Sequence, residues 1–147
     1  MNATQWPEQY VLHVQKEIGI EAKPVTVFES ILEQLGEAFD TPDGKSMAMK
    51  LEAWPGGRWY RDLGDNAGHL WGHVQVIKPP MLLEIMGPMF MSYPVMSHIQ
   101  YRVTEEAGGC KLTMIHRAIG DINPEHRQGV GKGWQHIIES IKRRAQK

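Results

Sequence analysis

The sequence predicts an α+β fold, in which a curved antiparallel sheet of about seven strands wraps around a long C-terminal helix and a short helical segment follows the first strand. Three observations support this prediction. An alternating strand pattern and a short helical pattern begin the chain, a run of strand patterns separated by short turns follows, and a long amphipathic pattern ends it. Short turns favour antiparallel pairing, so one face of the sheet can meet water while the helix covers the other.

The first strand is expected at residues 10–20, where apolar and polar side chains alternate as in a half-buried strand. A helix is predicted from Pro24, because proline suits the first helical turn and apolar residues then recur at spacings of three and four up to Leu35. The turn sequence DTPDG at 40–44 ends this region. Lys16 shares the inward face of the strand, so we expect it to reach solvent from a strand end or to lie in a wet cavity.

The remaining strands are separated by recognisable turns. LEAWPGGRWYRDLG at 51–64 predicts a hairpin, because aromatic residues flank a Pro-Gly-Gly break. GDNAG at 64–68 and Ala107-Gly108-Gly109 predict two further turns, and Pro79-Pro80 interrupts another strand pattern. The strands themselves are expected at 47–54, 58–63, 69–78, 81–86, 95–105 and 110–118.

The C-terminal segment is predicted to be the long helix. Its apolar residues between Val130 and Ile141 fall within an arc of about 100°, the width of a core-facing stripe. Asn123-Pro124 is suited to cap and start it. Gly129, Gly131 and Gly133 each cost about 1 kcal/mol relative to alanine. We therefore expect a loose or kinked start, with regular helix from about Gly131 onward.

The composition is that of one folded domain, which we expect to span residues 1–147 with residues 1–9 as an N-terminal extension. Hydrophobic residues make up 41% and charged residues 22%, and the net charge of −1 argues against nucleic acid or an anionic membrane as a partner. No apolar stretch approaches the roughly 20 residues of a membrane span, and MNATQWPEQY lacks the features of a secretory signal. The single cysteine, Cys110, excludes an internal disulfide, so we expect a cytoplasmic protein.

Five segments together resemble the START-related helix-grip (SRPBCC) superfamily, in the branch similar to the C-terminal domain of the activator of the heat-shock-protein-ninety ATPase. The resemblance covers residues 10–144, and its strength lies in the order and spacing of the segments. They are IEAKPVTVFESI (20–31), WPGGRWY (54–60), GHVQVIKPPMLLEIM (72–86), GGCKLTMIHRAIGD (108–121) and GKGWQHIIESI (131–141).

This resemblance implies a helix-grip fold with a cavity between the sheet and the long helix, which such proteins often use for apolar or amphiphilic ligands. It does not imply one reaction. We expect a cavity of at least ~300 Å³, bordered by aromatic residues of the 51–64 hairpin. Trp54, one face over, should point outward. The candidate ligand-binding residues are Trp59, Arg61, Met86, Phe90, Tyr101, Met114, His116, Trp134 and Ile138.

The seven histidines invite a metal hypothesis, which their spacing does not support. HLWGH places His69 and His73 in strand-patterned sequence, where four residues span about 13 Å, too far for two ligands of one metal. We expect no metal site and no cofactor. Four other histidines fall on polar faces and are expected to be solvated: His13, His98, His126 and His136.

No catalytic residue is predicted, because the chain carries no nucleophile elbow and GVGKG lacks the serine or threonine of a P-loop. His116 is expected to point beneath the long helix, either as a core histidine bonded to a backbone carbonyl or as a polar group in a ligand chamber. The leading hypothesis is binding of a hydrophobic or amphiphilic small molecule. The alternatives are a protein-interaction or co-chaperone-like module, and a hydrolase or cyclase that uses His116 in the cavity.

Overall fold

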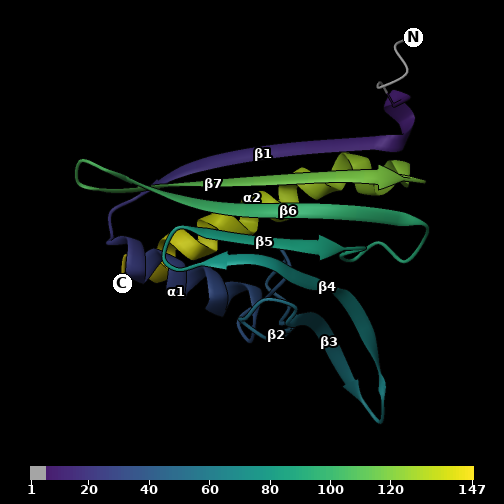
Figure 1. Ribbon diagram of the computed structural model, residues 1–147, viewed down its shortest axis with the longest axis horizontal. Helices are drawn as coiled ribbons and strands as arrows, with labels where there is room; N and C mark the ends of the chain where they lie inside the picture. The colour runs from purple at the N-terminus through teal and green to yellow at the C-terminus, as the bar shows by residue number, and fades with distance from the viewer. Residues whose placement is uncertain (1–5) are drawn as a thin grey trace.

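The sheet has the strand order β1-β7-β6-β5-β4-β3-β2, with every neighbouring pair antiparallel, and it curves around the long helix α2 (Figure 1). This computed structural model describes residues 6–147, so part of the predicted N-terminal extension lies outside it. The α+β helix-grip prediction is confirmed. The elements are η1 (Glu8–Tyr10), β1 (Val11–Ile20), α1 (Pro24–Leu35), β2 (Lys50–Leu51), β3 (Arg58–Gly64), β4 (Ala67–Lys78), β5 (Leu82–Gly87), β6 (Val95–Glu106), β7 (Gly109–Gly120) and α2 (Pro124–Ala145).

Strand β1 lies at one edge of the sheet and pairs with β7, although the two strands are far apart in the sequence. The two strands are paired from Val11 opposite Ile119 to Ile20 opposite Cys110. This pairing brings the chain's beginning next to the strand that leads into α2. The remaining strands follow one another as hairpins, because short turns join them.

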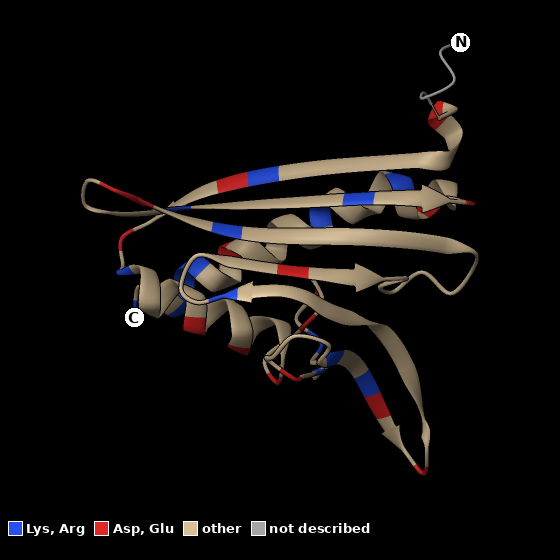
Figure 2. Cartoon of the chain, in the orientation of Figure 1, with Lys and Arg blue, Asp and Glu red and all other residues tan. Residues whose placement is uncertain are grey.

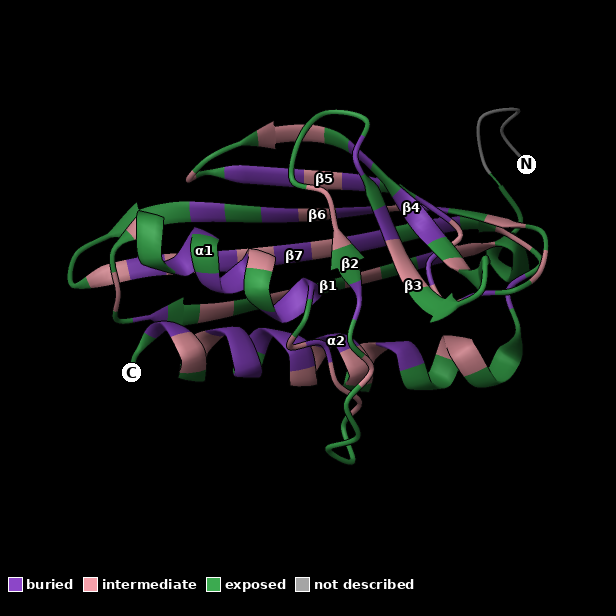
Figure 3. Cartoon of the chain, turned by 90° about the horizontal axis from the view of Figure 1, so that it is seen from below, coloured by how far each residue is buried: buried purple, intermediate pink, exposed green. Residues whose placement is uncertain are grey.

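Both helices pack on the same concave face of the sheet (Figure 3). That face presents fully buried aliphatic residues such as Leu83, Ile85, Ile99 and Leu112. Alternate strand residues point to the opposite face, which meets solvent. Within residues 6–147, no helix is long and apolar enough to cross a membrane.

The expectation of a loose start to the last helix was wrong, because α2 is regular from Pro124. Asn123 caps it, its side chain accepting a hydrogen bond from the Glu125 backbone N–H at 2.8 Å. Arg127 anchors the first turns to the start of the chain by donating to the carbonyl oxygens of Val11, at 2.7 Å, and Gln9, at 2.9 Å. These contacts offset the poor helix propensity of the glycines.

The strand expected at 47–54 is also much shorter, since β2 contains Lys50–Leu51 alone. The residues before it bond to the end of α1 instead of to a strand. The Met49 N–H donates to the Gly36 carbonyl at 3.0 Å, and the Met47 N–H donates to the Phe39 carbonyl at 2.8 Å. As a result, the segment that follows α1 folds back as a loop beside both helices, and this loop forms one wall of the site described next.

Candidate functional site

A pocket of about 330 Å³ lies between the first half of α2, the loop that follows α1, strand β4 and the connection from β5 to β6. Its volume meets the lower bound expected from the sequence. Its apolar walls come from segments distant in sequence: Phe39, Met47, Trp71, Phe90, Val130, Trp134 and Ile137.

The aromatic rings of this wall meet one another edge to face. Trp71 contacts Phe39 at a centroid distance of 5.3 Å and Phe90 at 6.0 Å. Phe90 in turn contacts Trp134 at 6.4 Å. Such edge-to-face contacts are a favoured geometry and hold the rings in place. The pocket therefore has a fixed aromatic wall on the side of the sheet.

Trp59 packs behind this wall, in the core. Its ring lies 5.1 Å from that of Trp71, and its indole N–H donates to the Leu35 carbonyl at 2.7 Å. The side chain is fully buried and does not line the pocket. Trp54, across the Gly-Gly turn, is exposed as expected. The hairpin at 51–64 thus supports the wall through Trp59.

The glycines of α2 leave room on the opposite side of the pocket. Gly129 and Gly133 line it, and a Cβ atom at either position would meet no atom within 4 Å. Gly131 faces another direction, where a Cβ would approach the Lys16 side chain. Because these two glycines lie one helical turn apart, they expose a smooth strip of helix backbone to the pocket.

His116 is a fully buried core residue bonded at both ring nitrogens. Its Nδ1 accepts the indole N–H of Trp134 at 2.9 Å, so the ring proton resides on Nε2, which lies 2.9 Å from the Ser97 hydroxyl. Burial lowers the pKa of His116 from its ordinary 6.5 to about 4. The partners are side chains rather than the backbone carbonyl expected, and His116 holds Trp134 from behind without lining the pocket.

Of the predicted ligand residues, Phe90 and Trp134 line the pocket. Tyr101, Met114 and Ile138 are fully buried in the core. The Tyr101 hydroxyl has no hydrogen-bond partner among residues 6–147, and burial raises the pKa of this phenol above its usual range.

Met86 and Arg61 lie elsewhere. Met86 was expected to point inward but is 36% exposed, because the inward positions of β5 are Leu83 and Ile85 and its side chain falls on the other face. Arg61 is half-buried on β3, in a hairpin that projects beyond the body of the sheet (Figure 1). Leu63, two residues further along β3, is exposed for the same reason.

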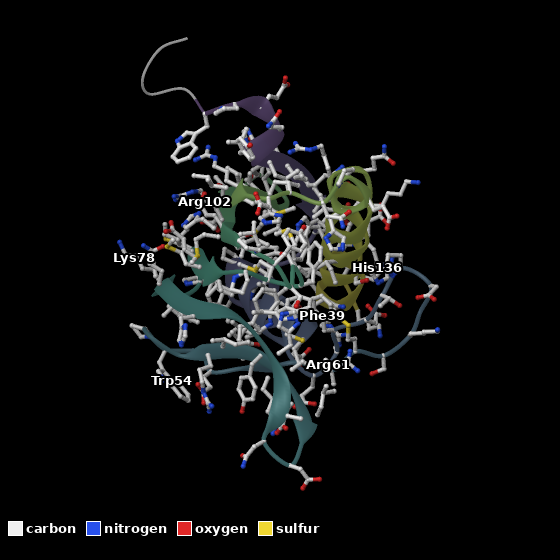
Figure 4. All side chains as sticks on the ribbon, turned by 90° about the vertical axis from the view of Figure 1, so that its right-hand side faces the viewer. Phe39, Trp54, Arg61, Lys78, Arg102 and His136 are labelled. Atoms are coloured by element: carbon white, nitrogen blue, oxygen red, sulfur yellow. The ribbon has the colours of Figure 1, made fainter. Side chains whose placement is uncertain are left out.

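Asp40 joins the loop that follows α1 to both helices. Its Oδ1 accepts from His136 of α2 at 2.8 Å and from Gln34 of α1 at 3.2 Å. Figure 4 labels His136 on α2, beside this loop. The expectation that His136 is solvated was wrong, because the loop covers it. The Asp40–His136 pair therefore holds the loop against α2 beside the pocket.

His126 was also expected to be solvated, and the structure instead places it in the pocket lining. Its Nδ1 lies 2.8 Å from the Tyr93 hydroxyl, and the two rings stack at 5.6 Å with an interplanar angle of 15°. The Phe90 ring contacts it edge-on at 5.1 Å. His98 bonds to Glu84 at 3.2 Å, whereas His13 is exposed as expected.

Sequence reasoning missed several lining residues, above all Phe39, Trp71 and His126. Trp71 lies within HLWGH in the strand expected at 69–78, where strand alternation could have indicated that it points inward. No local pattern marks Phe39, because it follows the end of a helix. His126 lies at the edge of the apolar stripe of α2, four residues before Val130, so helical spacing could have indicated that it faces inward.

Charges of both signs are spread over the sheet and the two helices (Figure 2). Among residues 6–147, no three His, Cys, Asp or Glu side chains are grouped to hold a metal ion. The half-buried Asp40 carboxylate is the charge built into the pocket wall, while the Glu125 and Lys132 side chains are exposed at its rim.

The sequence profile of the "Activator of Hsp90 ATPase homolog 1-like protein" family matches residues 21–146. No curated protein matches significantly by sequence. Many solved structures share the fold. One, protein CV1439 from Chromobacterium violaceum, has a TM-score of 0.72 at 14% identity, with 92% of this chain and 97% of that chain covered. A second, from Rhizobium leguminosarum, has a TM-score of 0.69 at 15% identity, covering 92% and 94% of the two chains.

A third similar structure is StfQ, a di-domain ARO/CYC from the steffimycin biosynthetic pathway. It has a TM-score of 0.66 at 12% identity, and the match covers 93% of this chain and 51% of StfQ. At these identities the structural likenesses establish the fold alone.

Proposed function

This chain belongs to the Activator of Hsp90 ATPase homolog 1-like family, and on that premise we propose that it binds an apolar or amphiphilic small molecule between the sheet and α2. The single cysteine, Cys110, supports a reducing, cytoplasmic setting for this binding. The proposal concerns reversible binding and requires no covalent step.

The observation that carries the proposal is the pocket itself. It has the volume of a small ligand site, about 330 Å³, and its walls are aromatic and aliphatic. Apolar space left empty in a protein costs stability, because the side chains around it lose contacts. A ligand of matching shape would regain those contacts and remove its own apolar surface from water.

The enzymatic alternative has less support. His116, the residue considered for it, has both ring nitrogens bonded and lies outside the pocket lining. The structural neighbour StfQ is named as an ARO/CYC, so this fold does occur in proteins with a named biosynthetic role.

The protein-interaction alternative rests on exposed apolar side chains of the projecting β3–β4 hairpin and the turn before it, Trp54, Leu63 and Leu70. Exposed apolar residues of this kind are common on protein surfaces. The pocket is the more specific feature.

The proposal is tested with the neutral fluorescent probe N-phenyl-1-naphthylamine. We expect saturable enhancement of its fluorescence by the wild-type protein. Gly133→Leu, which would place a side chain in the pocket, should weaken probe binding about tenfold or more.

Gly131→Leu is the matched control, since it makes the same change on the same helix where the side chain faces away from the pocket. It should retain wild-type affinity for the probe. Absence of wild-type binding, or equal weakening by the two substitutions, would contradict the proposal.

A further inference from the structure

His126 is a half-buried polar residue of the pocket wall, and one of its ring nitrogens is unused. Within residues 6–147, its Nε2 makes no hydrogen bond, although the ring is half-buried in the lining. Asp40 uses Oδ1 for His136 and Gln34, and its carboxylate can only accept hydrogen bonds. Thr41 is occupied by Asp43 and by the Lys45 backbone.

The contacts of Tyr93 determine which ring nitrogen of His126 carries the proton. The Asn123 backbone N–H donates to the Tyr93 oxygen at 3.2 Å and takes up an acceptor position there. The other group within hydrogen-bond distance of this hydroxyl, in the described part of the chain, is His126 Nδ1 at 2.8 Å. The hydroxyl proton is therefore directed at Nδ1, and the imidazole proton resides on Nε2.

The ring is also fixed in orientation. Tyr93 stacks on one face and Phe90 packs edge-on, so rotation of the ring would break both aromatic contacts. The backbone of His126 belongs to the first turn of α2, which the Asn123 cap and the Arg127 contacts hold to β1. A donor held in this way recognises a partner with little loss of conformational entropy.

We propose that His126 Nε2–H is the pocket's directed hydrogen-bond donor, and that the ligand is an uncharged aromatic molecule carrying a carbonyl oxygen. This inference rests on the proposed function and names its ligand class. The aromatic walls formed by Trp71, Phe90 and Trp134 suit a planar ring system. A negatively charged ligand is disfavoured, because the half-buried Asp40 carboxylate is part of the wall and no cationic side chain is buried there with it.

The test uses two ligands of the same shape, 2-acetylnaphthalene and 2-isopropenylnaphthalene, which differ in having C=O or C=CH₂. Both affinities are measured by quenching of tryptophan fluorescence, since Trp71 and Trp134 line the pocket. The quantity compared is the ketone-to-alkene affinity ratio, because a ratio cancels the changes in shape and stability common to both ligands. In His126→Phe we expect this ratio to fall about three- to tenfold, the value of one hydrogen bond.

Two variants separate recognition from packing. Tyr93→Phe keeps the stacked ring but removes the hydroxyl that orients Nδ1, and it should lower the ratio by less than His126→Phe does. His13→Phe changes an exposed histidine on β1 and should leave the ratio unchanged. Circular dichroism checks that each variant is folded.

A measurement on the wild type makes the test independent of the variants. In the complex, the carbonyl carbon of ¹³C-labelled 2-acetylnaphthalene should resonate downfield of its position in an apolar solvent, because the bound oxygen accepts a hydrogen bond. A resonance at the apolar-solvent position, or an unchanged ratio in His126→Phe, would overturn the assignment of His126 and leave the binding proposal standing. If neither naphthalene binds the wild type, and N-phenyl-1-naphthylamine does not bind either, the binding proposal itself fails.

Discussion

Trp59 and Trp134 show how one residue type serves two purposes in this protein. Both are almost fully buried, and both indole N–H groups are bonded within the fold. Trp59 meets Phe39 and Trp71 on its inner side and has no contact with the pocket, whereas Trp134 forms part of the pocket lining. The difference lies in what covers each ring, since both rings come from inward-facing positions.

His116 makes stability depend on pH, because it is neutral in the folded protein. Its folded pKa of about 4 lies below the ordinary 6.5, so between these values the unfolded chain binds more protons than the folded one. The free energy of unfolding should therefore fall as the pH decreases from about 6.5 to about 4, by on the order of 3 kcal/mol from this residue.

Urea unfolding at several pH values across this range measures the effect. His116→Gln cannot gain a proton, so its unfolding free energy should be lower at neutral pH but less dependent on pH between those values. A variant with the same pH dependence as the wild type would show that other groups cause it.

At the scale of elements, α2 has a well-anchored N-terminal half although its glycines have low helix propensity. The Asn123 cap, the Arg127 contacts and the Trp134–His116 bond fix its first half. Gly129 and Gly133 lower its propensity, yet they also leave the pocket open. We infer that a side chain added on this face of the helix would increase the stability of the fold and reduce the volume of the pocket.

Gly133→Ala should therefore stabilise the protein and impair binding together. The added methyl group meets no atom within 4 Å, and alanine improves helix propensity, so we expect a gain of up to about 1 kcal/mol in unfolding free energy. The same methyl group takes up pocket space and should reduce affinity for N-phenyl-1-naphthylamine severalfold. Urea unfolding and probe titration measure the two effects.

Gly57→Ala provides the contrast for this prediction. A Cβ at Gly57 would lie against the Glu52 carbonyl, so that substitution should destabilise the protein. Destabilisation by Gly133→Ala would instead mean that the helix cannot accept a side chain toward the pocket.

For the whole molecule, the pocket lies where three separate segments meet. The loop that follows α1, the strands with their Phe90 connection, and α2 each supply one wall. Unfolding any one of them removes the site, so ligand binding should stabilise the fold as a unit.

A thermal melt tests this linkage. At about one hundred times its dissociation constant, N-phenyl-1-naphthylamine should stabilise the protein by ~2.7 kcal/mol and raise the melting temperature by several degrees. Zinc or a chelator should leave the temperature unchanged, since no group of metal ligands is present among residues 6–147. A chelator-induced fall would contradict our interpretation of the histidines.

Much of the fold could be predicted from the sequence, because strands and helices each give apolar residues a characteristic spacing. Alternation located β1, and apolar spacing after Pro24 located α1 within its observed bounds. Asn123-Pro124 also predicted the start of α2, and the contact of Arg127 with β1 offsets the low helix propensity of the three glycines. β2 was not predictable in its short form, because the bonds that replace it are made to the end of α1.

The sequence by itself determined the order of the elements, the inward faces of β6, β7 and α2, and the presence of Phe90 and Trp134 on the inner side of the fold. Tertiary structure alone decided which interior residues meet a pocket and which meet one another. The spacing of apolar residues predicts that a side chain points inward. Whether that side chain then meets another side chain or a pocket depends on segments that are distant in the sequence. Trp59 became core because Phe39 and Trp71 cover it, and His126 became part of the pocket because Tyr93 and Phe90 fold over it.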